Sequence, residues 1–278
     1  MTDLGQSLFG KDDLVADLQA LGLRAGDGVF VHCALGKVGH VIGGPRGLIL
    51  ALMDVVGPEG LIGMPGFCRD AYDPVAIFDL DVPAEMHARI KDQVLGFDAD
   101  RSDVRQNGSV PEAFRTWPGV VRSPHPTSSV LLWGAEAGNL SVPHDVHGWA
   151  TGPDTPWGRL MTRPKMKILL IGVGWNRCSA LHAAETISLH KRSKTRHFKL
   201  GNLQTGVWID APDVADDLDT LFPLVGAAWE AEGQVTSGQI GKAQAMLTDY
   251  GAVVSFAADW LNARNKRDGV PPTDLAMH

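Results

Sequence analysis

The chain has 278 residues, of which 44% are hydrophobic and 21% charged, and this length can bury a large core in one α/β domain without a disulfide or a metal. The formal net charge of −7 disfavours nucleic acid as a partner and favours a cationic ligand, and no apolar run approaches the about 18 residues of a membrane-spanning helix. Three widely spaced cysteines without a CxxC pair argue against a disulfide framework or zinc site, and the N-terminus lacks the pattern of a secretory signal, so we expect a cytoplasmic protein.

The N-terminal part of the chain predicts alternating helices and strands. Residues 11–22 place leucines at helical spacing, and GDGVFVHCAL then predicts a buried strand that ends near His32. Residues 43–58 open with Gly-Gly-Pro and predict a second helix, and GLIGMPGF predicts a second strand. This succession of strand, helix and strand is typical of a layered α/β fold.

The middle of the chain is less regular. Residues 68–118 are rich in Asp, Pro and Arg, with one short helix near their end, and so long an irregular stretch is usually functional or mobile. SSVLLWG then predicts a strand, and GAEAGNL a helical turn.

The C-terminal part begins with the clearest buried strand, KMKILLIGVGW. The remaining expected elements are a helix over 179–190, a hairpin over 197–210, helices over 214–230 and 236–248, and an amphipathic helix over 253–266. We therefore predict a single layered α/β/α domain over residues 1–270 with a mixed sheet, an irregular inserted region at about 68–118, and a loose tail over 271–278.

The segment GVGWNRCSALHAAE, residues 172–185, carries the main candidate for catalysis. It predicts a strand end, a loop and a helix whose first turn presents His182, with Glu185 on the same helix face. A histidine at such a place is able to be neutral near pH 7 and to accept a proton. The alternative is a histidine that caps the helix or packs in the core, and the position alone leaves both open.

The segment VHCALGKVGHVIGG, residues 31–44, is another strand that leads into a loop of small residues. Its backbone amides and Lys37 could hold a pyrophosphate, although it matches neither glycine-rich phosphate motif. Cys33 beside His32 is a candidate nucleophile, but neighbours on a strand point to opposite faces, which favours a packed thiol.

Two further segments have both a structural and a functional interpretation. The carboxylates of WIDAPDVADDLD, residues 208–219, have three interpretations: a solvated face, groups that orient an imidazole, or groups that pair with the amines of a ligand. Asp213 is also a candidate helix N-cap. Thr155 before Pro156 predicts a helix start, which either caps the helix or attracts phosphate. No metal-binding spacing is present, so we expect no metal.

Taken in order, these segments resemble the aminoglycoside 3-N-acetyltransferases, a family with its own antibiotic N-acetyltransferase fold. The similarity includes VHCALGKVGHVIGG, the stretch FDADRSDVRQNGSVPEAFRTWPGVVRSPHPTSS, HGWATGPDTPWGRL and the Leu-His-x-Ala-Glu helix start, and it covers almost the whole chain. The chain departs from the family in Cys33 and Ala34, where the opening motif has serines, and residues 68–96 match poorly.

The resemblance also implies roles for particular residues. His182 matches the family's catalytic base, and Asp213, with Asp210 as the alternative, matches the acid that supports it. Contacts with coenzyme A are expected at His32, Cys33, Ala34, Leu35, Lys37, Val38, Ser123 and Thr155. The amines of the acceptor are expected at Asp70, Asp73, Glu185 and Asp210.

The resemblance implies an acetyltransferase that moves acetyl from acetyl-coenzyme A to the 3-amino group of the 2-deoxystreptamine ring of an aminoglycoside, and so confers antibiotic resistance. We expect a monomer or homodimer with a small, cationic amine as acceptor, and with no nucleic acid, membrane or metal. Three alternatives stay open: the same reaction on a different, non-antibiotic amine, a binding homologue without catalysis, and a thiol hydrolase that uses Cys33.

Overall fold

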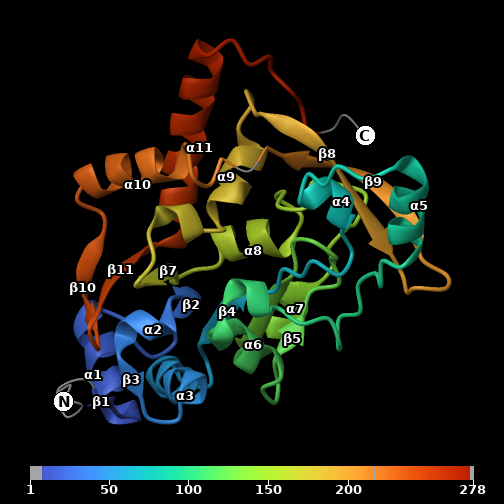
Figure 1. The fold of residues 1–278 in the computed structure, drawn as a ribbon. Helices are drawn as coiled ribbons and strands as arrows, with labels where there is room; N and C mark the ends of the chain where they lie inside the picture. The colour runs from blue at the N-terminus through green and yellow to red at the C-terminus, as the bar shows by residue number, and fades with distance from the viewer. Residues whose placement is uncertain (1–7, 216, 276–278) are drawn as a thin grey trace.

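The centre of the molecule is a seven-stranded mixed sheet (Figure 1). The computed structural model describes residues 8–215 and 217–275. In order across the sheet, the strands are β10 (Thr236–Ile240), β11 (Ala243–Asp249), β7 (Met166–Ile171), β2 (Gly28–Cys33), β4 (Leu61–Pro65), β6 (Val130–Gly134) and β5 (Val121–Arg122). β7, β2 and β4 are parallel to one another, and the other neighbours pair antiparallel.

Helices cover both faces of this sheet. One face carries α1 (Lys11–Leu21), α3 (Pro45–Val56) and α6 (Ser109–Arg115), and the other carries α8 (Pro156–Thr162), α9 (Leu181–Ile187), α10 (Phe222–Ala231) and α11 (Tyr250–Arg267). Side chains alternate along each strand, so Val29 and Val31 of β2 join the first core while Phe30 joins the second. The predicted α/β/α layering and mixed sheet are therefore confirmed.

Short elements complete the two layers. They are β1 (Leu8–Phe9), which pairs in parallel with β3 (His40–Val41), α2 (Leu35–Val38), α7 (Ala137–Ser141) and the 3-10 turns η2 (Arg105–Asn107) and η3 (Trp175–Arg177).

A smaller unit lies on one side of the sheet, at the right of Figure 1. It consists of the hairpin β8 (Ser193–Leu200) and β9 (Val207–Val214) together with α4 (Pro74–Ile77) and α5 (Ala84–Asp92). Phe198 of the hairpin is fully buried against Ala71, and the Lys199 ammonium donates to the Val94 carbonyl at 3.0 Å. The segment expected to be irregular thus contains helices that are attached to the hairpin.

Three sequence predictions about the C-terminal half are wrong. Residues 236–248 form the hairpin β10–β11 and not a helix, the helix expected over 214–230 begins only at Phe222, and the helix expected over 179–190 covers only Leu181–Ile187. At the turn of the β10–β11 hairpin, Gly241 has φ +56°, and a Cβ there would lie 2.4 Å from the Val38 carbonyl oxygen. The buried residues Ala243, Ala245 and Leu247 follow the period of two that is typical of a strand. In so short a segment, the spacing of apolar residues does not distinguish this period from that of a helix.

Part of the expected loose tail is attached to the body. The Thr273 amide donates to the Leu189 carbonyl at 2.8 Å, and the Lys191 ammonium donates to the Thr273 carbonyl. Residues 276–278 of that tail lie outside the described residues. Across residues 8–215 and 217–275, no helix has both the length and the apolar character needed to cross a bilayer.

Candidate active site

A cavity of about 560 Å³ opens where the three parallel strands end. His32 and Cys33 at the end of β2, Pro65 at the end of β4 and Val173 after β7 form part of its wall, and His182 of α9 forms another part. Ligands of open α/β sheets bind outside the carboxyl ends of parallel strands. The cavity is therefore the site that the fold itself favours.

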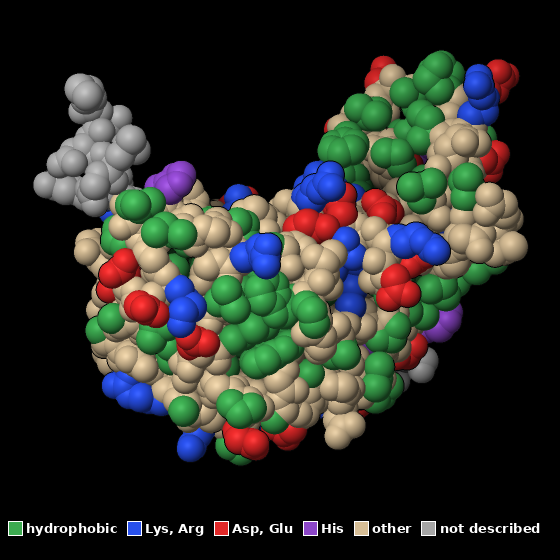
Figure 2. Space-filling model, turned by 90° about the horizontal axis from the view of Figure 1, so that it is seen from below, with side chains coloured by type: hydrophobic (Ala, Val, Ile, Leu, Met, Phe, Trp, Pro, Cys, Tyr) green, Lys and Arg blue, Asp and Glu red, His purple; other side chains and the backbone are tan. Residues whose placement is uncertain are grey.

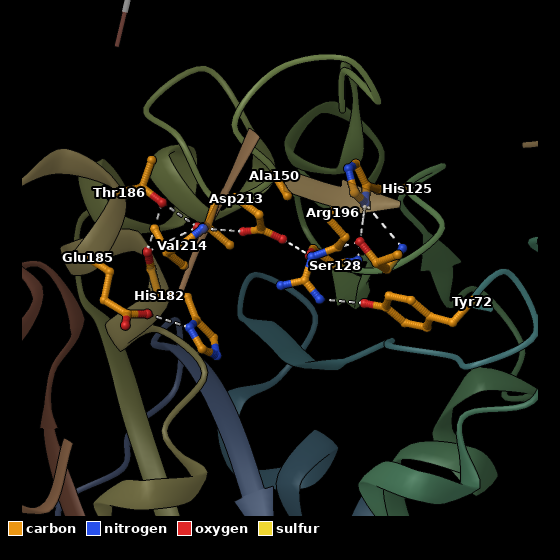
Figure 3. Close-up of polar contacts among 12 residues, drawn as sticks. Tyr72, His125, Ser128, Ala150, His182, Glu185, Thr186, Arg196, Asp213 and Val214 are labelled. Atoms are coloured by element: carbon orange, nitrogen blue, oxygen red, sulfur yellow. Dashed lines mark hydrogen bonds and ion pairs between the residues drawn. The ribbon is translucent and has the colours of Figure 1, made fainter. Parts of the chain in front are cut away.

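His182 and Glu185 form a buried pair on α9 (Figure 3). Because α9 begins at Leu181, His182 lies in its first turn and Glu185 follows three residues later on the same face. His182 Nδ1 lies 2.6 Å from Glu185 Oε2, and Glu185 Oε1 accepts a hydrogen bond from the Asp217 amide at 3.1 Å. The carboxylate thus favours the tautomer with the proton on Nδ1 and the lone pair on Nε2.

Asp213 lies in a different arrangement from the expected one. Its carboxylate pairs with Nε of Arg196 and accepts from the Val214 amide at 2.8 Å, and Arg196 also donates to the Tyr72 hydroxyl at 2.7 Å. Asp213 belongs to β9, so it is not the N-cap of the next helix. In Figure 3, this row of side chains lies beside the His182–Glu185 pair, in which Glu185 contacts His182 Nδ1.

His32 and Cys33 contribute uncharged groups to the wall of the cavity. Burial, and then the nearby His182, lower the pKa of His32 to about 3, and its Nε2 accepts from the Ser179 amide at 3.3 Å. Burial raises the pKa of the Cys33 thiol to about 12. At neutral pH, neither group carries charge, which argues against Cys33 as a thiolate nucleophile.

Lys37 borders a neighbouring cavity of about 600 Å³, which Lys242 and Gly172, the residue after β7, also border. Val173 borders this cavity and also the one at His182, so the two adjoin. Gly172 has φ +65°, and a Cβ there would come within 3.0 Å of the Lys37 side chain. Two cations and a glycine that leaves space beside them fit a phosphate-bearing ligand.

The other residues expected at coenzyme A make hydrogen bonds and packing contacts within the protein. The Ala34 amide donates to the Ile171 carbonyl at 2.9 Å, Leu35 packs against the first core, and Val38 is buried within it. Ser123 is fully buried, and its hydroxyl accepts from the Val130 amide and contacts His144 Nδ1, each at 2.9 Å.

Thr155 is placed before α8 as expected, but its hydroxyl donates to the Gly152 carbonyl at 2.7 Å and does not cap the helix. Neither Thr155 nor Ser123 borders the cavity at His182 or the cavity at Lys37.

The acidic residues expected at the acceptor are spread apart. Asp70 borders a third cavity, of about 650 Å³, beside the one at His182. Asp73 is buried, caps α4 through the Val75 amide at 3.0 Å and contacts His87 Nε2 at 2.7 Å. Asp210 is exposed and lies 2.6 Å from His197 Nδ1.

Sequence reasoning missed several residues that border the cavity. They include Tyr72, Thr151, Asn176, Arg177 and Arg196. Arg196 lies in SKTRHFKL, whose charges are those of a solvated strand, so the sequence carries no signal that it faces the site. In the described part of the chain, no group of three or more His, Cys, Asp and Glu residues is arranged to hold a metal ion.

Comparisons with known proteins show which family the chain is similar to. A family model described as aminoglycoside 3-N-acetyltransferase matches residues 30–262. Aminoglycoside N(3)-acetyltransferase IX of Micromonospora chalcea is 33% identical over 267 residues, which cover 90% of this chain and 92% of that protein.

Solved structures give the same result for the fold. The YokD protein of Bacillus subtilis is similar with a TM-score of 0.86 and 29% identity, over 96% of this chain and 99% of that one. AAC-IIIb in a binary complex with CoASH has a TM-score of 0.79 and 30% identity, over 93% and 98% of the two chains. AAC-VIa bound to sisomicin has a TM-score of 0.78 and 32% identity, over 93% and 99%.

Proposed function

The chain belongs to the aminoglycoside 3-N-acetyltransferase family, and on that premise we propose that it transfers acetyl from acetyl-coenzyme A to an amine of an aminoglycoside, with His182 as general base. The observation that carries the proposal is the His182–Glu185 pair at the wall of the cavity where β2, β4 and β7 end. The acceptor atom is the 3-amino group of the 2-deoxystreptamine ring, and its acetylation would give antibiotic resistance.

The donor occupies the adjoining cavities. Lys37 and Lys242 would hold phosphate groups, and the wall at Cys33 and Val173 would hold the end that carries the acetyl group. When bound, acetyl-coenzyme A supplies the acetyl group as a thioester. The space beside Gly172 supports this assignment, because a larger residue would meet the Lys37 side chain.

His182 removes a proton from the acceptor. An ammonium group has no lone pair, so the amine becomes a nucleophile only after His182 Nε2 has taken its proton. The Glu185 carboxylate, 2.6 Å from Nδ1, then stabilises the imidazolium. His32 supports the same step because, with a pKa of about 3, it stays neutral and adds no positive charge beside the imidazolium.

General base catalysis by a positioned side chain contributes about 10²–10⁴-fold to the rate. Holding amine and thioester together in one cavity supplies much of the remainder. Both effects need only the geometry of the cavity, and neither requires a metal.

We also propose that residues 1–270 act as one unit, as a monomer or homodimer in the cytoplasm. The free thiols of Cys33, Cys68 and Cys178 support a reducing compartment.

The experiment is a thiol-release assay with acetyl-coenzyme A and a panel of aminoglycosides, followed by mass spectrometry for the gain of one acetyl group. Release that depends on the aminoglycoside, and NMR assignment of the product to the 3-amino group, are expected. Binding of the aminoglycoside without thiol release would instead favour a binding homologue without catalysis.

A further inference from the structure

The cavity that adjoins the acceptor site is largely apolar. Its volume is about 650 Å³, and its walls include Ile77, Phe78, Met86, Ile90 and Val94. Arg69 and Tyr72 border both this cavity and the one at His182, so the two cavities adjoin at those side chains. We name the one at His182 the inner cavity and the one under α4 and α5 the outer cavity.

One wall of the outer cavity is formed by α5. None of the α5 residues is buried, yet Met86, Ile90 and Val94 recur every four residues along this helix and the residues that follow it. That apolar stripe faces the outer cavity and not the core. Figure 2 shows hydrophobic side chains gathered on the arm that projects at the right, the side on which α4 and α5 lie in Figure 1.

Several of these side chains remain accessible. Phe78 is 57% exposed and Met86 49% exposed, although both border the outer cavity. Exposed apolar residues that line a concavity mark a place where an apolar group binds. Because the outer cavity adjoins the inner one at Arg69 and Tyr72, a molecule whose amine lies at His182 could place that apolar group there.

Charge in the inner cavity points to the same class of ligand. Among the described residues that line it, Arg69, Arg177 and Arg196 carry positive charge, and the carboxylate is that of Asp213, which is paired with Arg196. In the outer cavity, Arg69 and Arg89 are balanced by Asp70 and Asp92. The charged side chains of the outer cavity therefore offer no excess of carboxylates to a second ammonium group, whereas an apolar substituent needs none.

We infer that the outer cavity is an acceptor subsite, and that the enzyme acetylates primary amines that carry an alkyl or aryl group in addition to aminoglycosides. This inference rests on the proposed acetyl transfer by His182. The amine would lie at His182, and the apolar group would extend past Tyr72 to Phe78 and Met86.

The test uses a series of straight-chain primary amines from ethylamine to heptylamine, with acetyl-coenzyme A and thiol release as the measurement. These amines have the same ionisation, so the series varies only the apolar area. Burial of one methylene contributes about 0.8 kcal/mol, so kcat/KM should rise about fourfold with each carbon that enters the outer cavity. An aminoglycoside is assayed in parallel.

Two wall variants and a matched control complete the design. Phe78→Ser and Met86→Ser should flatten the dependence of kcat/KM on chain length. Leu80 lies between α4 and α5, is 46% exposed and does not border the cavity, so Leu80→Ser should leave the dependence on chain length intact.

The outcomes separate the inference from the function on which it rests. A flat series in the wild type together with turnover of the aminoglycoside would overturn the subsite and leave the proposed function standing. An equal loss of slope in Leu80→Ser would overturn it as well. Absence of thiol release with every amine, the aminoglycoside included, would overturn the proposed function and the subsite with it.

Discussion

Replacement of Glu185 by glutamine tests the catalytic arrangement most directly. The carboxylate accepts from His182 Nδ1 at 2.6 Å and from the Asp217 amide at 3.1 Å, one bond on each oxygen. A glutamine has one oxygen and one NH₂ group, so it can preserve only one of these two bonds. If its NH₂ faces His182, the ring must carry its proton on Nε2, which removes the lone pair that would accept the proton of the substrate.

If the glutamine oxygen faces His182 instead, the tautomer survives but the negative charge is lost. Opposite unit charges about 4 Å apart interact by about 4 kcal/mol at the effective dielectric constant of about 20 that fits protein sites. With half or all of that charge developed at the transition state, Glu185→Gln should lower kcat by about 30- to 1,000-fold. The acid limb of the pH–rate profile should also move to lower pH, because the imidazolium is stabilised less.

The assay is thiol release at saturating acetyl-coenzyme A, with Asp213→Asn as the matched control. Both variants replace a buried carboxylate near the cavity by an amide, but Asp213 contacts Arg196. The double variant His182→Ala/Glu185→Gln should be no slower than His182→Ala, since both residues act through one unit. A larger loss of kcat in Asp213→Asn than in Glu185→Gln would refute the assignment of Glu185 and restore Asp213 as the supporting acid.

Four further predictions follow from single features of the structure. Asp213→Asn should reduce the free energy of unfolding in urea by about 1.5–3 kcal/mol, because it weakens a charged hydrogen bond to Arg196, and an unchanged midpoint would contradict this. The pKa of Cys33 is about 12, compared with 9.0 for an unperturbed thiol, so Cys33 should react with iodoacetamide about 10³-fold more slowly at pH 7 than a free thiol. The variant Cys33→Ser should remain active. The free energy of unfolding should fall as the pH drops from 6.5 toward 4. In the folded protein, His32 and His144 have pKa values of about 3 and about 4, so in this pH range they take up protons only after unfolding. Equal stability at pH 7 and pH 4.5 would be inconsistent with their burial. Lys37→Ala should raise the KM for acetyl-coenzyme A more at low than at high ionic strength, whereas a salt-independent effect would argue against a phosphate contact.

Local patterns predicted most of the architecture. The alternation of Val29, Phe30 and Val31 in a continuous apolar run is that of a strand covered on both faces, and it produces the two cores that the structure shows. The same patterns failed over 236–248, because the turn at Gly241 depends on contact with Val38, which is distant in sequence.

The amino-acid sequence by itself determined the family, the strand-loop-helix segment that presents His182 and the presence of Glu185 on the same helix face, because all of these depend on residues close together in the chain. Only the tertiary structure decided which side chain each of these carboxylates contacts. On the β8–β9 hairpin, Arg196 lies opposite Ala211 and Asp213 lies opposite Lys194, in a register that no local pattern fixes. The diagonal ion pair between Arg196 and Asp213 directs the Asp213 carboxylate to the arginine. The apolar outer cavity likewise depends on the packing of α5 beside α4, since the stripe of Met86, Ile90 and Val94 is equally consistent with burial in a core.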